Sequence, residues 1–104
     1  MAQRNIIWTQ TAEIQLRGVL EYWVKRNYSK NYSLKLVQLI NKRTQQISEN
    51  PLLFKVTDYP KTRAASLGNF TIFYKTTDSS IVVTGFWDNR QDPQSLLKLI
   101  RNKK

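Results

Sequence analysis

The sequence predicts an α+β fold: a two-helix hairpin packed on one face of a three- to four-stranded antiparallel sheet, with a short strand before it and a short C-terminal helix after it. Two observations support this. Between residues 11 and 48, apolar side chains recur at helical spacing in two segments. Beyond residue 52 the spacing changes to that of strands separated by tight turns. With 104 residues, the chain has the size of one domain, so we expect residues 1–104 to form a single unit.

The first two predicted elements are a strand over residues 4–9 and a helix from about Thr11 to the break at residues 27–29. Thr9 or Thr11 can cap the helix, and Glu13 lies in its first turn, where the helix dipole favours an acid. The apolar residues recur at i, i+4, i+7, i+8 and i+11. They are Ala12, Leu16, Val19, Leu20 and Trp23.

A second helix is predicted from the cap residues Ser29 or Asn31 to about Ser48. Its apolar stripe consists of Leu36, Val37, Ile40 and Ile47. The sequence Asn50-Pro51 ends it, because proline cannot continue a helix and disfavours helical geometry in the residue before it.

Three strands follow, over residues 62–67, 70–76 and 81–87, with turns at Gly68-Asn69 and at residues 78–80. Alternation predicts that one face carries Phe70, Ile72 and Tyr74, and that Ile81, Val83 and Trp87 also share a face. Asp92-Pro93 then opens the C-terminal helix. The apolar side of this helix is formed by Leu96, Leu97 and Ile100.

Charge is the strongest global signal. Seventeen Lys and Arg against seven Asp and Glu give a net charge of +10. Such a field speeds encounters with nucleic acid, the ribosome or an acidic protein. There is no signal-peptide pattern and no apolar run of membrane length, so we expect a cytoplasmic protein that does not bind membranes.

Several chemistries are excluded by composition. The chain has no His and no Cys, which removes zinc sites of the usual kind, histidine acid–base catalysis and thiolate nucleophiles. Three glycines cannot form a phosphate-binding loop, and seven carboxylates are few for a two-metal nuclease. We therefore expect neither a metal nor a cofactor.

The remaining candidates for a site are basic. Lys55, Lys61 and Arg63 lie just before and within the first of the three strands, and Arg90 follows the last. If strand ends bring them together, Arg63 and Arg90 can converge on a phosphate through bidentate contacts. Trp87, close to Arg90, can stack on a base.

The alternative is that each arginine pairs with a nearby acid, Arg90 with Asp88 or Asp92 and Arg63 with Asp58. Both interpretations stand on the sequence alone, because a basic cluster is a common surface feature.

The chain resembles the RelE/ParE superfamily of toxins in several segments that occur in order. They are Ile7-Trp8-Thr9 with Ala12 and Leu16, Tyr22-Trp23, Ile47-Ser48-Glu49-Asn50-Pro51, Arg63 with Leu67-Gly68-Asn69-Phe70 and Ile72-Phe73-Tyr74, and Ile81-Val82-Val83 with Phe86-Trp87-Asp88-Asn89-Arg90-Gln91-Asp92-Pro93. The resemblance implies the toxin of a type II toxin–antitoxin module. Its partner would be a co-expressed antitoxin that wraps an extended or helical segment around it in a hetero-oligomer. The positive charge suits an acidic antitoxin, and Leu96, Leu97 and Ile100 are candidates for contacting it.

The superfamily contains two mechanisms. RelE-like toxins cleave mRNA on the ribosome, and Lys55, Lys61, Arg63 and Arg90 are the candidate catalytic residues for that reaction. The acid–base residue often found near the C-terminus of that branch is missing after Arg90. The nearest plausible substitute in the chain is Tyr74, which precedes Arg90. ParE-like toxins inhibit DNA gyrase without catalysis and are slightly preferred, with Lys61, Arg63, Trp87 and Arg90 as target-binding candidates. A third interpretation is a non-toxic RNA-binding or ribosome-associated protein.

Overall fold

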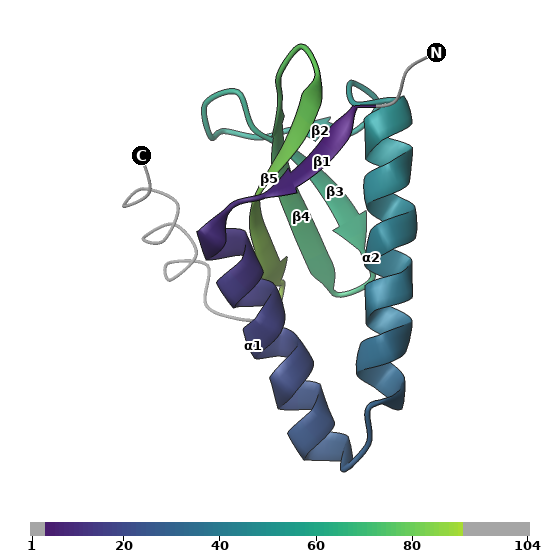
Figure 1. Cartoon of the computed structure of the whole chain (residues 1–104). Coiled ribbons are helices and arrows are strands. Elements are labelled where there is room, and N and C mark those ends of the chain that lie inside the picture. Colours follow the sequence, from purple (N-terminus) through teal and green to yellow (C-terminus); the bar gives the residue numbers. More distant parts are fainter. Residues whose placement is uncertain (1–3, 91–104) are drawn as a thin grey trace.

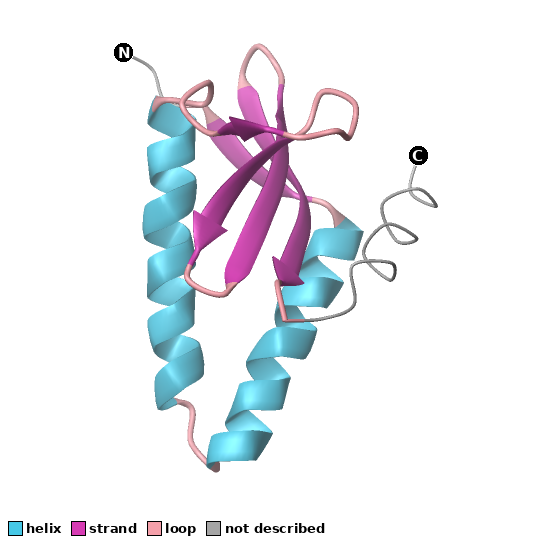
Figure 2. Cartoon of the chain, turned by 180° about the vertical axis from the view of Figure 1, so that it is seen from behind, coloured by secondary structure: helices cyan, strands magenta, loops and turns pink. Residues whose placement is uncertain are grey.

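Two helices form a V that opens toward a twisted sheet, and both arms of the V share one hydrophobic core with it (Figures 1 and 2). The computed structural model describes residues 4–90. Within them, the helices are α1 (Gln10–Asn27) and α2 (Asn31–Glu49). The strands are β1 (Asn5–Trp8), β2 (Lys55–Val56), β3 (Arg63–Leu67), β4 (Phe70–Thr76) and β5 (Ser80–Asp88). The predicted C-terminal helix lies outside the described residues.

The sheet is mixed, which corrects the expected antiparallel sheet of three to four strands. Its order is β1-β5-β4-β3-β2, and within the described chain it has five strands. The β3-β4-β5 meander is antiparallel as predicted, but β1 pairs with β5 in parallel, from Asn5 with Ser80 to Trp8 with Val83. The parallel pair is possible because the chain crosses over through the helical layer between the two strands. Strand β2 was not predicted because two residues carry no readable alternation.

The helix ends show which caps the chain uses. The Thr9 side chain accepts a hydrogen bond from the backbone N–H of Ala12 at 3.2 Å, so Thr9 and not Thr11 caps α1. Tyr28 ends the helix in a left-handed conformation (φ 51°). The N-cap of α2 is Lys30, which makes no side-chain cap, so neither predicted residue occupies that position. The hydroxyl of Ser29 nevertheless accepts from the backbone N–H of Asn31, at 3.1 Å.

A β-bulge decides which side chains of β5 face the core. Phe73 of β4 pairs with Gly85, but the next residue pairs with Val83, which leaves Thr84 as an extra residue on β5. After the bulge, Phe86 joins the core cluster and Trp87 does not. The predicted shared face of Ile81, Val83 and Trp87 is therefore wrong for Trp87, because one inserted residue reverses the alternation.

The core confirms the predicted inner face of β4 and most of the two helical stripes, with Trp23 and Val37 as the exceptions. It contains buried side chains from both helices and from β3, β4 and β5. They are Ala12, Leu36, Ile40, Ile47, Ala65, Leu67, Phe70, Ile72, Tyr74, Ile81, Val83 and Phe86. Neither described helix is long and apolar enough to cross a membrane.

Candidate functional site

Arg63 lies at the start of β3 and is held by the loop before β2. Its guanidinium donates to the carbonyl oxygens of Phe54 at 2.7 Å and Leu52 at 3.3 Å. One of the two alternatives for Arg63 was a pair with Asp58, but these two residues form no ion pair, and the loop carbonyls are the partners of Arg63. Arg63 therefore fixes the path of residues 52–54.

Tyr74 lies directly opposite Arg63 in the sheet and is fully buried. Its hydroxyl donates to the carbonyl oxygen of Pro51 at 2.6 Å, which ties β4 to the end of α2. Burial raises the pKa of Tyr74 to about 12, while the positive charge of Arg63 lowers it in part. A buried, hydrogen-bonded phenol of this kind is poorly placed to exchange protons with a substrate.

Lys55 and Lys61 lie at the open edge of the sheet, on β2 and on the turn that follows it. Both side chains are exposed, and Lys61 takes a left-handed backbone conformation (φ 54°). The apolar side chains beside them are unusually open to solvent. The exposed fraction is 71% for Leu52, 76% for Leu53 and 64% for Val56. We call Leu52, Leu53, Lys55, Val56 and Lys61 the β2 edge.

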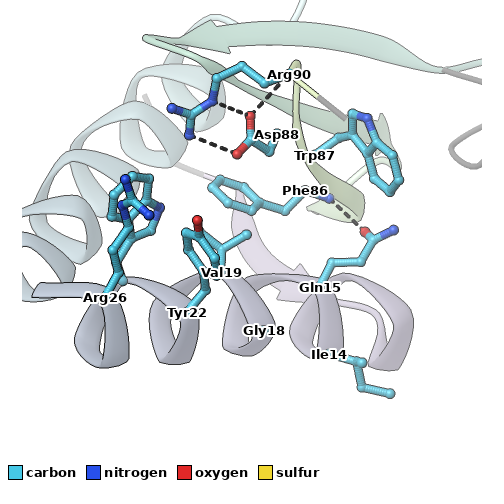
Figure 3. A pocket seen from close by; sticks show the side chains of 11 residues that line it. Ile14, Gln15, Gly18, Val19, Tyr22, Arg26, Phe86, Trp87, Asp88 and Arg90 are labelled. Carbon is cyan, nitrogen blue, oxygen red and sulfur yellow. Dashed lines mark hydrogen bonds and ion pairs between the residues drawn. The ribbon is translucent and has the colours of Figure 1, made fainter. Parts of the chain in front are cut away.

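Arg90 lies just beyond the end of β5 and pairs with Asp88, as one of the two predicted alternatives requires. Its side chain donates to both carboxylate oxygens, from Nε at 2.9 Å and from Nη2 at 2.8 Å (Figure 3). The guanidinium also lies over the rings of Trp23 at 5.5 Å and Phe70 at 6.0 Å. The hydrogen bonds from Arg90 hold the pKa of Asp88 below its usual range, against the opposing effect of burial.

The two arginines do not converge, which corrects the expectation of a shared phosphate site. The sheet places Arg63 beside Tyr74, and Tyr74 beside Val83 of β5. Arg90 follows Val83 by seven residues along β5 and past its end. At the usual rise per residue of a strand, this places Arg90 about 20 Å from Val83. Of the four basic candidates, three lie near one end of the sheet, namely Lys55, Lys61 and Arg63. The fourth, Arg90, lies near the other end.

A hollow lies between α1 and the C-terminal half of β5. Strand β1 covers β5 only from Ser80 to Val83, and within residues 4–90 no other strand pairs with that edge of β5 beyond Val83. At Phe86 a side chain of α1 takes the place of a neighbouring strand. The Gln15 side chain accepts a hydrogen bond from the backbone N–H of Phe86 at 2.9 Å (Figure 3). The hollow has a volume of about 680 Å³, and we call it the α1–β5 groove. Its walls include Ile14, Gly18, Tyr22, Arg26, Phe86 and Trp87.

Sequence reasoning missed this groove, although one signal was present. Ile14, Gly18 and Tyr22 recur at i, i+4 and i+8, beside the core stripe of α1, and form a second side of the helix. Ile14 is 58% exposed and Tyr22 is 53% exposed. Trp87, predicted as a possible stacking residue, is buried in the wall of the groove, with 7% of its surface exposed.

Metal-binding residues do not gather in the part of the chain that is described. Within residues 4–90, no three Asp or Glu side chains come together in a way that could hold an ion. The antitoxin candidates Leu96, Leu97 and Ile100 lie outside the described residues.

Comparison with known proteins gives one family and one fold. The family model described as "ParE toxin of type II toxin-antitoxin system, parDE" matches residues 6–93. A solved structure described as "Chromosomal ParDE TA system from P. aeruginosa" superposes with a TM-score of 0.68 at 18% sequence identity. That match covers 81% of this chain and 94% of the other, and it shows that the two share a fold. None of the curated proteins compared matches this sequence.

Proposed function

This chain belongs to the ParE toxin family of type II toxin–antitoxin systems, and we propose that it inhibits DNA gyrase by binding it, without catalysing a reaction. It is a ParE-like toxin that is paired with an antitoxin.

The observation that carries the non-catalytic mechanism is that Tyr74, Arg63 and Arg90 are each engaged within the fold, and that Arg90 lies far from the other two. RNA cleavage by attack of the 2′-hydroxyl needs a proton acceptor and a cation at the same phosphate. Here the hydroxyl of Tyr74 is buried against Pro51, and Arg63 is hydrogen-bonded to loop carbonyls. Arg90 is bound to Asp88 at the far end of the sheet. Tight binding to a protein target needs none of these groups to act together.

The β2 edge is the surface that we propose to meet gyrase. Small proteins seldom expose neighbouring apolar side chains without a binding role, and three such residues lie here within five positions. Two exposed lysines flank them, Lys55 and Lys61. Apolar contacts surrounded by flexible cations are typical of protein interfaces with acidic partners. Of the four predicted target-binding residues, Lys61 would then contact gyrase directly. Arg63 would support this surface by holding the loop before β2.

The antitoxin is proposed to be acidic and to neutralise the toxin in a cytoplasmic hetero-oligomer, as the net charge of +10 suggests. The association rate of toxin and antitoxin should then fall clearly as salt screens the attraction. An association rate that does not change with salt would contradict the electrostatic part of this proposal.

The test uses purified gyrase and the two exposed leucines Leu53 and Leu34. Wild-type protein should inhibit supercoiling of relaxed plasmid, and Leu53→Asp should weaken inhibition by at least tenfold because it places a charge in the proposed contact. Leu34→Asp is the matched control, because Leu34 is also exposed (59%) but lies on α2. Equal loss in both variants would refute the β2 edge as the contact.

A second measurement separates the two toxin mechanisms. The protein is added to a purified translation system, and cleavage of mRNA in the ribosome is mapped by primer extension. We expect no codon-positioned cleavage. Rapid cleavage that Lys61→Ala abolishes, together with unaffected gyrase, would make the protein an mRNA interferase and overturn the proposal.

A further inference from the structure

The closed end of the helical V carries aromatic and basic side chains close together. The junction of α1 and α2 extends beyond the end of the sheet (Figures 1 and 2). We call residues 17–35, which form this end, the hairpin tip. It contains five cations and one acid, Glu21. The cations, all of them exposed, are Arg17, Lys25, Arg26, Lys30 and Lys35. The aromatic residues are Tyr22, Trp23, Tyr28 and Tyr32.

Three of the four rings form a connected row across the two helices. The Trp23 ring lies edge-on to that of Tyr22 at a centroid distance of 5.1 Å, and it lies 5.0 Å from the ring of Tyr32 on α2. The Ser33 hydroxyl donates to the Leu20 carbonyl oxygen at 2.8 Å, which holds the two helices together beside the row. The row is therefore fixed in place, and its outer rings are open to solvent, Tyr22 by 53% and Tyr32 by 39%.

The fourth ring, that of Tyr28, stands at the turn itself and contributes little to the packing of the fold. Tyr28 is 95% exposed and has a left-handed backbone conformation (φ 51°). Bulky residues are uncommon in this conformation, where glycine or asparagine is favoured. Its sequence neighbours are the polar residues Asn27 and Ser29, and the cations Arg26 and Lys30 follow on either side. An exposed ring among cations is suited to contact with a molecule outside the chain.

We propose that the hairpin tip binds single-stranded nucleic acid, with bases stacking on Tyr22, Tyr28 and Tyr32 and with phosphates contacting the cations. Exposed aromatic rings stack on the faces of unpaired bases, whatever the sequence. A duplex keeps its bases stacked inside and would leave these rings unused. An acidic protein would also be attracted by the cations. However, the centre of a protein interface is depleted of charged residues, whereas Arg26 and Lys30 flank the most exposed ring here.

This surface is separate from the proposed contact with gyrase. The hairpin tip includes the start of α2, whereas the β2 edge follows the end of that helix. The 19 residues of α2 put about 28 Å between the two surfaces. One molecule can therefore use both at once, and nucleic-acid binding at the tip does not depend on the inhibition of gyrase.

The test titrates fluorescently labelled oligo(dT) and oligo(rU) with the full chain and follows the anisotropy. Both should bind, and a DNA duplex of the same length should bind more weakly. Tyr28→Ala should weaken binding by at least about fivefold, because one stacking contact is lost. Tyr28→Phe keeps the ring and should bind like wild type. The tighter of the two oligonucleotides shows whether the surface prefers DNA or RNA.

Two exposed lysines test the contribution of charge. Lys30→Gln should reduce the slope of log affinity against log salt by about 0.7, the value for one phosphate contact with a single strand. Lys42→Gln is the matched control, because Lys42 is exposed on α2 but lies outside the hairpin tip, and it should leave the slope unchanged.

Four results would overturn the proposal. They are full affinity in folded Tyr28→Ala, equal losses in the two lysine variants, a duplex that binds as tightly as the single strands, and no binding at about 100 μM protein, the weak limit of non-specific nucleic-acid binding. Binding of polyglutamate but of neither oligonucleotide would also overturn it, and would indicate an acidic protein as the partner of the tip.

Discussion

Replacing Tyr74 with phenylalanine removes one hydroxyl from the centre of the molecule and should cost stability without removing activity. The hydroxyl is fully buried and donates to the Pro51 carbonyl at 2.6 Å. In Tyr74→Phe that carbonyl loses its partner, for which we expect a loss of about 1–3 kcal/mol in the free energy of unfolding at pH 8. Gyrase inhibition at a temperature where the variant is folded should be unchanged, because the phenol takes no part in target binding.

The same substitution should change the response to alkali. The pKa of Tyr74 is raised from 10.0 to about 12 in the folded protein. A raised pKa means that the stabilisation is fully present below pH 10 and is lost as the pH rises toward 12, at about 1.4 kcal/mol per pH unit. Wild type should therefore lose stability over this range through Tyr74, and Tyr74→Phe should not. The stability advantage of wild type at pH 8 should shrink or reverse near pH 12.

The assay is urea unfolding followed by tryptophan fluorescence from pH 8 to pH 12. Tyr28→Phe is the control for loss of a phenol at the surface, because Tyr28 is 95% exposed and its removal should not change the stability at pH 8. Parallel alkaline slopes for wild type and Tyr74→Phe would refute the assignment of a raised pKa to this residue. Lost gyrase inhibition in the folded variant would refute its purely structural role.

Three other substitutions test single contacts. Gln15→Ala should lower the free energy of unfolding by about 1–3 kcal/mol, because the buried N–H of Phe86 loses its acceptor; native-state hydrogen exchange should show that amide opening faster. Thr9→Ala should cost about 1 kcal/mol through loss of the α1 cap, whereas Thr9→Ser should restore most of it in the same denaturation experiment. Arg90→Ala should raise the pKa of Asp88, followed by NMR titration, and an unchanged pKa would show that Arg90 is not its main stabilising partner.

Most of the fold was predictable from the sequence because each long element has a strong local pattern. Both helices carry one-sided apolar stripes, and Gly68-Asn69 marks the turn between β3 and β4. The parts that failed depend on contacts between distant residues. The pairing of β1 with β5 joins residues about 75 positions apart, and the bulge at Thr84 is set by the partner strand.

The site was less predictable than the fold for the same reason. The basic residues Lys55, Lys61, Arg63 and Arg90 could be singled out from the sequence, but their mutual distances depend on strand register. A backbone carbonyl as the partner of Arg63 also cannot be read from sequence, because every residue has one. The α1–β5 groove arises where β1 stops short of the end of β5, and a strand length of four residues does not by itself indicate which part of a neighbour stays uncovered.

The pairing of the first strand with the last has a consequence for synthesis of the protein on the ribosome. Residues 5–8 leave the ribosome first, but their partners at 80–83 emerge only after the helices and the rest of the sheet have been made. Non-local strand pairs of this kind form slowly, because a long loop must close before they stabilise anything. A nascent chain therefore lacks a complete sheet until residues 80–83 have emerged. Any activity that needs the complete fold is delayed by the same interval, which leaves time for an antitoxin to be present when the fold closes.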